Sequence, residues 1–145
     1  MLPQRVREEG GRGFVQRVLR EQRGDRSRAW AILPVGRPDV IGQIRLIDID
    51  LSYRHRSAEV GYWIRRSEWG RGFGTEALRL VVRFAFSTLR LHRLQATVAA
   101  GNARSARVLE KVGFRREGVA RHVLRRAGRW RDDWLFGLLR SEFLS

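Results

Sequence analysis

The stretch Glu68-Trp69-Gly70-Arg71-Gly72-Phe73-Gly74-Thr75 decides the fold, because it joins a predicted strand directly to a predicted helix. Its alternating glycines allow successive backbone N–H groups to turn toward one point without obstruction by a Cβ atom. At the N-terminus of a helix, such N–H groups and the helix dipole attract an anion, and phosphate is the usual one. The stretch therefore predicts a phosphate-binding loop.

Two common nucleotide-binding motifs do not fit this loop. A P-loop requires Gly-Lys followed by Ser or Thr, whereas the only lysine of the chain is Lys111. A dinucleotide-binding loop requires G-x-G-x-x-G with an acidic residue about 20 positions further on. The spacing here is G-x-G-x-G, and residues 88–101 contain no acidic residue. The loop therefore suits the pyrophosphate of a ligand that is carried rather than cleaved.

Strands and helices alternate on both sides of the loop. A helix is predicted from Thr75 to about Leu89, with an apolar stripe made by Leu78, Val81, Val82, Ala85 and Leu89. A second helix is predicted from Asn102 to Val112, and Gly113 ends it. Strands are predicted over residues 29–33, about 40–51, 58–64 and 92–98, and in a C-terminal hairpin that turns at Ala127-Gly128. Parallel strands in the middle and hairpins at both ends predict one mixed α/β sheet.

Length and composition limit the classes of protein that the chain can represent. Its 145 residues suit one domain, and 43% apolar residues are enough for a packed core. The chain has no cysteine and only three scattered histidines, so it predicts no disulfide, thiolate nucleophile or metal site. It has neither a long apolar run nor the apolar segment of a signal peptide, so we expect a cytoplasmic protein without membrane contact.

The formal net charge of +15 comes almost entirely from arginine. Such a charge predicts weak, non-specific attraction to polyanions, including rRNA, at low salt. Residues 1–28 form an Arg-rich start in which Phe14, Val15, Val18 and Leu19 follow helical spacing, so a short amphipathic helix is expected there.

Three blocks of sequence resemble the GNAT superfamily of N-acetyltransferases. RRSEWGRGFGTEALRLVVRFAF resembles its acyl-CoA loop and helix, and LHRLQATVAAGNARSARVLEKVGFRREG resembles the strand and helix that follow in the RimJ/RimL-like branch, which acetylates ribosomal-protein alanine. GRWRDDWLFGLLRSEF resembles the closing strand of that branch. The resemblance implies a single GNAT-like domain over residues 1–145, with an acetyl-CoA-binding core at 58–113 and two central parallel strands that splay apart.

The resemblance also implies a set of cofactor-binding residues. The pantetheine would lie between the splayed strands and pair with backbone groups of Tyr62, Trp63 and Ile64. The pyrophosphate would lie on the loop formed by Gly70, Arg71, Gly72, Phe73, Gly74 and Thr75. Asn102 would bond the pantetheine and Ser105 would reach the thiol sulfur as a catalytic donor, although both residue types are also ordinary at a helix start. No metal is implied.

The chemistry predicts direct attack of an amine on acetyl-CoA, because a chain without cysteine cannot form an acetyl-cysteine intermediate. A peptide α-amine has a pKa of about 7.7–8.0, so making it neutral at pH 7 costs roughly 1–1.4 kcal/mol. A weakly placed carboxylate is then a sufficient base. Glu59 is the first candidate and Asp132 the second, while ion pairs with arginine are the structural alternatives for both. Glu117 is a third and structural candidate.

The acceptor stays open at this level. A ribosomal-protein N-terminus is one possibility, and a small-molecule amine, amino acid or antibiotic is another. A different class, a non-enzymatic Arg-rich nucleic-acid-binding protein, is the third.

The start of the chain departs from the pattern of the family, since almost nothing here fills the place of its first strand and helix. The strand at 29–33 should therefore have an unpaired edge. We expect either a homodimer that covers this edge or a more open acceptor cleft, with residues 1–12 mobile or ordered by a neighbouring chain.

Overall fold

The computed structural model describes residues 15–18, 22–23 and 26–143. Its strands are β1 (Val15–Val18), β2 (Gln22–Arg23), β3 (Arg28–Pro34), β4 (Gly42–Asp50), β5 (Ser57–Ile64), β6 (Arg93–Ala99), β7 (Arg115–Arg126) and β8 (Arg129–Leu139). Its helices are α1 (Phe73–Ser87), α2 (Ala103–Val112) and the short α3 (Arg140–Phe143), with a 3₁₀ turn at Arg66–Glu68. Among these residues no helix is long and apolar enough to cross a membrane.

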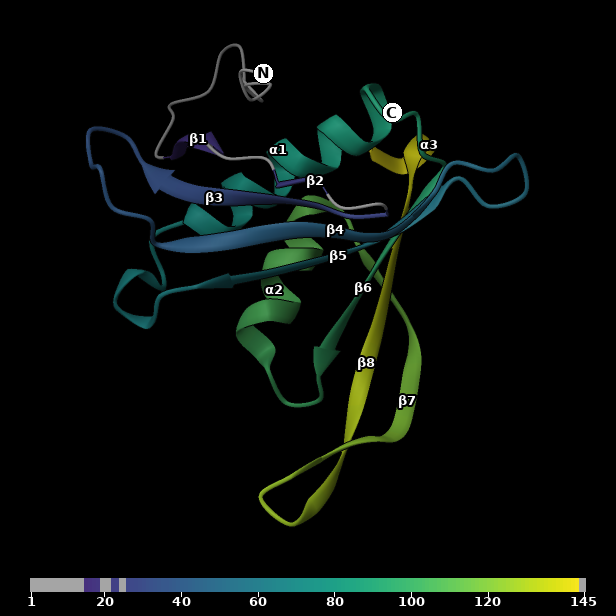
Figure 1. Cartoon of the computed structure of the whole chain (residues 1–145). Coiled ribbons are helices and arrows are strands. Elements are labelled where there is room, and N and C mark those ends of the chain that lie inside the picture. Colours follow the sequence, from purple (N-terminus) through teal and green to yellow (C-terminus); the bar gives the residue numbers. More distant parts are fainter. Residues whose placement is uncertain (1–14, 19–21, 24–25, 144–145) are drawn as a thin grey trace.

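The strands form one mixed sheet in the order β1-β3-β4-β5-β6-β8-β7, and β2 also pairs with β3 (Figure 1). Within the described residues β5 and β6 form the parallel pair, and the other pairs are antiparallel. The predicted mixed sheet with two central parallel strands is therefore confirmed.

The parallel strands separate soon after they meet. Their pairing runs only from Ser57 to Glu59 on β5 and from Arg93 to Gln95 on β6. β5 then continues to Ile64 beside β4, while β6 continues to Ala99 beside β8. One edge of β5 is thus left open over its second half.

The core lies on one face of the sheet, beneath α1 and α2. Side chains of β3 to β6 alternate between buried and accessible, so Trp30, Ile44, Val60 and Leu94 all point to this face. Four residues of the predicted stripe, Leu78, Val81, Val82 and Ala85, are buried against them, while Leu89 is half-buried just beyond the end of α1. The Trp30 and Phe84 rings meet edge to face with their centroids 5.4 Å apart. The helices and the sheet share one hydrophobic cluster, which holds the loop after β5 in place.

The start of the chain differs from the expectation. Residues 15–18 form a strand, not part of a helix, and they pair with β3 over Leu33 and its neighbours. β2 pairs with the beginning of the same strand. The unpaired edge of β3 was therefore a wrong prediction, and the homodimer loses the reason for which it was expected. Residues 1–12, expected to be mobile, lie outside the described residues.

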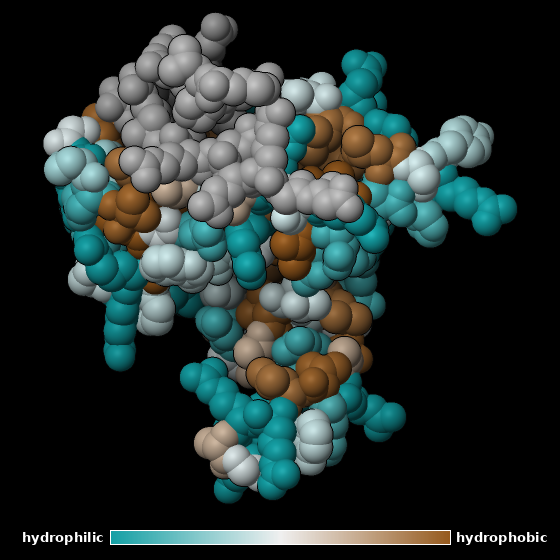
Figure 2. All heavy atoms as spheres, viewed as in Figure 1, coloured by the Kyte–Doolittle hydropathy of each residue, from teal (hydrophilic) through white to brown (hydrophobic). Residues whose placement is uncertain are grey.

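The C-terminal hairpin extends away from the rest of the sheet as an arm (Figure 1). Ala127 and Gly128 make a two-residue turn between Arg126 and Arg129, and both have positive φ, as a type I′ turn requires. The register of β7 against β8 shifts twice, once between Arg116 and Gly118 and once between Ala120 and Leu124. The space-filling view shows a mostly hydrophilic tip (Figure 2).

Candidate functional site

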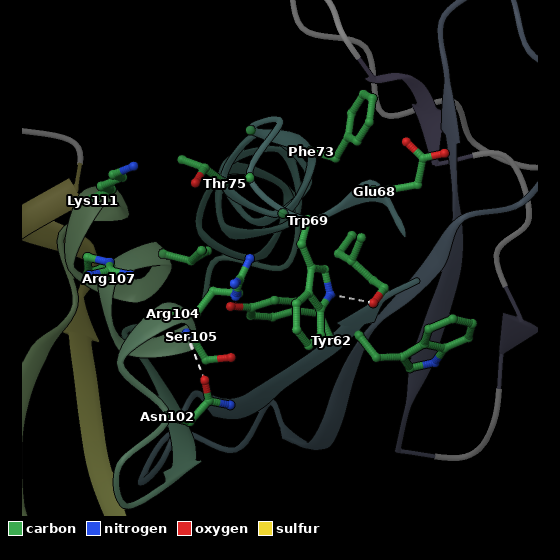
Figure 3. A pocket seen from close by; sticks show the side chains of 16 residues that line it. Tyr62, Glu68, Trp69, Phe73, Thr75, Asn102, Arg104, Ser105, Arg107 and Lys111 are labelled. Carbon is green, nitrogen blue, oxygen red and sulfur yellow. Dashed lines mark hydrogen bonds between the residues drawn. The ribbon is translucent and has the colours of Figure 1, made fainter. Parts of the chain in front are cut away.

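A pocket of about 510 Å³ lies where the end of β5, the loop after it and the start of α2 converge (Figure 3). From β5 it is lined by Tyr62, Trp63 and Ile64. From the loop and the first turn of α1 it is lined by Glu68, Trp69, Gly70, Gly72, Phe73, Gly74 and Thr75. The pocket thus joins the open edge of β5 to the predicted phosphate loop.

The loop has the backbone geometry that its glycines predict. Gly70 and Gly72 have φ values of +75° and +83°, which residues with a Cβ atom rarely adopt. Gly72 is the N-cap of α1, and its carbonyl accepts the first helical hydrogen bond from Glu76, at 3.1 Å. The N–H groups of the first three helical residues, Phe73 to Thr75, therefore have no acceptor within the helix. This is the arrangement that attracts a phosphate.

The edge of β5 offers backbone groups at every second residue. Arg65 donates its N–H to Ile41 at 2.7 Å, and the Trp63 carbonyl lies against Gly42, so these alternate residues face β4. Tyr62 and Ile64 consequently direct their backbone groups to the open side. The backbone groups of Trp63 face β4 and not the open side, so the pairing expected between them and the pantetheine is wrong. Trp63 nevertheless lines the pocket.

Trp69 closes part of this edge. Its indole Nε1–H donates to the Ile64 carbonyl at 2.8 Å, as Figure 3 shows. The Arg104 guanidinium of α2 lies 4.3 Å from the centroid of the same indole, within the range of a cation–π contact. Trp69 thus connects the loop to both β5 and α2.

The start of α2 supplies the two polar residues expected from the sequence. Asn102 is the N-cap, and its Oδ1 accepts a hydrogen bond from the Ser105 N–H at 3.3 Å. Both residues also line the pocket, and Ser105 is half-buried. Asn102 and Ser105 therefore both cap the helix and line the pocket.

Three cations of α2 line the same pocket: Arg104, Arg107 and Lys111. Among the described residues no carboxylate lies within ion-pair distance of them. Like charges three and four residues apart on a helix repel each other, so a bound anion would stabilise this face. Sequence reasoning missed these three residues, although their i, i+3, i+7 spacing, which places them on one face of a helix, was a sufficient signal.

A buried carboxylate anchors the other side of the loop. Glu68 is only 6% exposed, and it accepts hydrogen bonds from Arg37 at 2.7 Å, Arg71 at 2.9 Å and Arg65 at 3.4 Å. Asp39 shares Arg37 and Arg65, at 2.7 and 2.8 Å. The side chain of Arg71 is thereby held by Glu68, and it is absent from the pocket lining.

The arginines shift the acidity of both carboxyl groups. The hydrogen bond from Arg37, more than any other cause, lowers the pKa of Glu68 to about 2. Arg37 and then Arg65 lower the pKa of Asp39 to about 2 as well. Both groups are therefore charged at neutral pH and unsuited to act as a base. Sequence reasoning missed this cluster because only the fold brings Arg37 and Asp39 to Glu68, although Arg65 and Arg71 each lie three residues from it.

The two candidate bases lie outside the pocket lining. Glu59 lies at the last paired position of the parallel strands, and alternation along β5 places its side chain on the face opposite α1 and α2. Its Oε1 accepts a hydrogen bond from the Thr97 hydroxyl at 3.5 Å. The arginine pair considered for Glu59 is absent among the described residues.

Asp132 is a half-buried residue of the arm. Its Oδ1 accepts a hydrogen bond from the backbone N–H of His122 at 3.0 Å. The arginine pair considered for Asp132 is absent from the part of the chain that the structure describes, and the bulge in β7 instead brings a backbone donor to this carboxylate. Glu117, the structural candidate, does pair with arginine: Arg93 donates to its two oxygens at 2.6 and 2.9 Å.

Comparisons with known proteins identify the family of this chain. Residues 1–115 match the model of the acetyltransferase (GNAT) domain family. The "Probable N-acetyltransferase YjcK" of Bacillus subtilis is 34% identical over 134 residues, which cover 92% of this chain and 74% of that protein. The "Putative ribosomal N-acetyltransferase YdaF" of the same organism is 38% identical over 102 residues, covering 70% of this chain and 55% of that protein.

Solved structures show the same likeness. A chimera of the spermidine N-acetyltransferase SpeG from Vibrio cholerae with hSSAT superposes with a TM-score of 0.77 at 28% identity, covering 83% of this chain and 71% of that one. Mycobacterium smegmatis RimJ in complex with CoA-disulfide superposes with a TM-score of 0.76 at 34% identity, covering 83% of this chain and 56% of that one. Family, sequence relatives and fold thus agree, and the chain belongs to the GNAT family of acetyltransferases, which use acetyl-CoA.

Proposed function

We propose that this chain transfers an acetyl group from acetyl-CoA to the α-amine of a protein N-terminus by direct attack in a ternary complex. The observation that carries the proposal is the single pocket in which the open edge of β5, the N–H groups of the loop and the basic face of α2 meet. These three features match three chemical parts of acetyl-CoA: an amide-bearing arm, a pyrophosphate and a further phosphate.

The orientation of the cofactor follows from these features. The pyrophosphate would accept hydrogen bonds from the N–H groups of the loop at the start of α1. Much as an added strand would, the pantetheine amides would pair with the backbone groups of Tyr62 and with the N–H of Ile64 along the open edge, since the Ile64 carbonyl already accepts from Trp69. Arg107 and Lys111 would lie beside the remaining phosphate, while Asn102 and Ser105 would lie near the pantetheine and the sulfur.

The acceptor would approach from the opposite face of the sheet. Glu59 lies on that face, at the point where the parallel strands begin to separate. The acetyl group would reach the amine through this separation, so Glu59 would accept the amine proton directly or through a water molecule. Asp132, on the arm, is the second candidate for this role.

An α-amine is the preferred acceptor for two reasons. YdaF, which shares 38% identity with this chain, carries the name of a ribosomal N-acetyltransferase. An α-amine also needs less help to lose its proton than an amine with a pKa near 10.

A polyamine is the second candidate, because the structural neighbour SpeG is named as a spermidine acetyltransferase. The net charge of +15 opposes a polycationic acceptor, because long-range repulsion slows the encounter at low salt.

The test measures the release of free CoA thiol from acetyl-CoA by the full chain when each of a panel of amines is added. The panel contains peptides with a free N-terminal alanine, the same peptides with a blocked N-terminus, and spermidine. We expect turnover with the free peptides and acetylation of their α-amine by mass spectrometry. Turnover with spermidine but with no peptide would show that the acceptor is a polyamine and not an α-amine. If no amine caused thiol release, the proposed function would be refuted.

A further inference from the structure

The hydroxyl of Tyr62 is one of two buried side-chain polar atoms without a hydrogen bond among the described residues. The other, Arg140 Nε, lies at the end of β8, outside the pocket lining. A buried hydroxyl without a partner destabilises the folded state, because it has lost its hydrogen bonds to water. Such groups in folded proteins are rare and call for an explanation.

The position of Tyr62 suggests an explanation for its unpartnered hydroxyl. Its ring packs against the core and beneath the loop, where a Cβ atom on Gly74 would lie 3.6 Å from the ring carbon Cε2. Its hydroxyl points toward α2, between Arg104 and Ser105, and all three residues line the pocket (Figure 3). The phenol therefore lies beside the hydroxyl of Ser105, which α2 contributes to the pocket lining.

The phenol keeps its proton at neutral pH. Burial raises the pKa of Tyr62, and the neighbouring Ser105 side chain only partly opposes that rise. The group is therefore a neutral donor with one O–H to give. The two hydroxyls make no hydrogen bond in this structure, although Ser105 lies close enough to oppose part of the rise in the pKa of Tyr62.

We propose that Tyr62 is a positioning residue that donates its O–H to Ser105 Oγ when acetyl-CoA is bound. Ser105 then directs its own O–H at the thioester sulfur. This inference rests on the proposed function. It gives a role to the side chain of Tyr62, for which the sequence predicted only a backbone contact.

The role fits the electron balance of acetyl transfer. The amine nitrogen forms a bond to the acetyl carbon, the C–S bond breaks, and its electron pair stays on sulfur. The amine proton leaves to the base, and the thiolate takes a proton from solvent. The two hydroxyls transfer no net proton, and they lower the barrier by donating hydrogen bonds toward the sulfur as its charge develops.

The test compares Tyr62→Phe with the wild-type chain. The substitution removes one oxygen and keeps the ring. A positioning role predicts that kcat falls about tenfold, the size of one ordinary hydrogen bond, while KM for acetyl-CoA changes less than about twofold. The Tm without cofactor should stay equal or rise, because the unpartnered hydroxyl is gone. Tyr53→Phe is the matched control, since Tyr53, the other tyrosine of the chain, is 98% exposed.

A double variant decides whether the two hydroxyls act together. If Tyr62 acts through Ser105, then Tyr62→Phe with Ser105→Ala should be no slower than Ser105→Ala alone. The inference would be overturned if the two substitutions lowered kcat by factors that multiply in the double variant. It would also be overturned if kcat were unchanged in Tyr62→Phe. A wild-type chain that releases no thiol with any amine would instead refute the proposed function, so the two failures are distinguishable.

Discussion

Glu59 is the carboxylate whose proposed role depends most directly on pH. If it takes the proton of an α-amine, Glu59→Gln should lower kcat at pH 7. The deficit should shrink as pH approaches 9, because the amine, with a pKa of about 7.7–8.0, is then already neutral. The measurement is kcat between pH 6.5 and 9 for the variant and for Glu110→Gln, an exposed change on α2. A deficit of constant size would indicate that Glu59 is structural, through its contact with Thr97.

Glu68 should make the free energy of unfolding depend on pH in the acidic range. Its pKa of about 2 in the folded state lies below the value of about 4.3 expected for the unfolded chain, so the folded state binds fewer protons between these values. Its contribution is complete above about pH 5 and is lost as pH falls toward 2.

Glu68→Gln should therefore lower the Tm at pH 7 and flatten the decline of Tm between pH 5 and 2.5. Thermal unfolding across this range, with Glu110→Gln as the control, measures the difference. A variant with the wild-type slope would mean that other carboxyl groups control the acid transition.

At the level of single elements, the start of α1 offers the sharpest test of the loop. Gly72→Val forces a β-branched residue into a φ of +83°, which disturbs the N–H groups that would hold the pyrophosphate. Gly74→Val adds a side chain near Tyr62 and Ile64. Both variants should lose detectable acetyl-CoA binding by calorimetry while keeping the helical circular dichroism of the wild type.

Gly36→Val is the control, because Gly36 has a similar φ of +72° but lies in the turn between β3 and β4. It carries the same kind of backbone strain without touching the pocket. Retained binding in both loop variants would disprove the phosphate loop.

The elements that the sequence predicted share a strong local signal. α1 has an apolar stripe over four turns, α2 has an N-cap at Asn102 and a stop at Gly113, and the arm turns at Ala127-Gly128. β1 was missed because the spacing of its apolar residues fits a helix, and only pairing with β3 makes it a strand. The contacts of Arg37 with Glu68, of Arg104 with Trp69 and of Tyr62 with the α2 lining could not be predicted, because each joins segments far apart in the sequence.

At the scale of the whole molecule, charge should dominate encounters with polyanions. The net charge of +15 predicts non-specific binding to single-stranded RNA that weakens with salt. Contacts with two or three phosphates would make affinity fall by roughly tenfold between 50 and 200 mM salt. Fluorescence anisotropy with RNAs of several sequences measures this, and strong sequence preference or insensitivity to salt would contradict it.

The shifts of register in β7 have a consequence for how the protein behaves in concentrated solution. β7 is the outermost strand of the sheet on its side, so a row of backbone groups faces outward. A flat row of this kind recruits strands of other molecules and begins aggregation. Here two bulges break the row, and five arginines lie along the twelve residues of the strand. Concentrated protein should therefore stay clear at low salt, and turbidity should develop first where salt or a polyanion neutralises this strand.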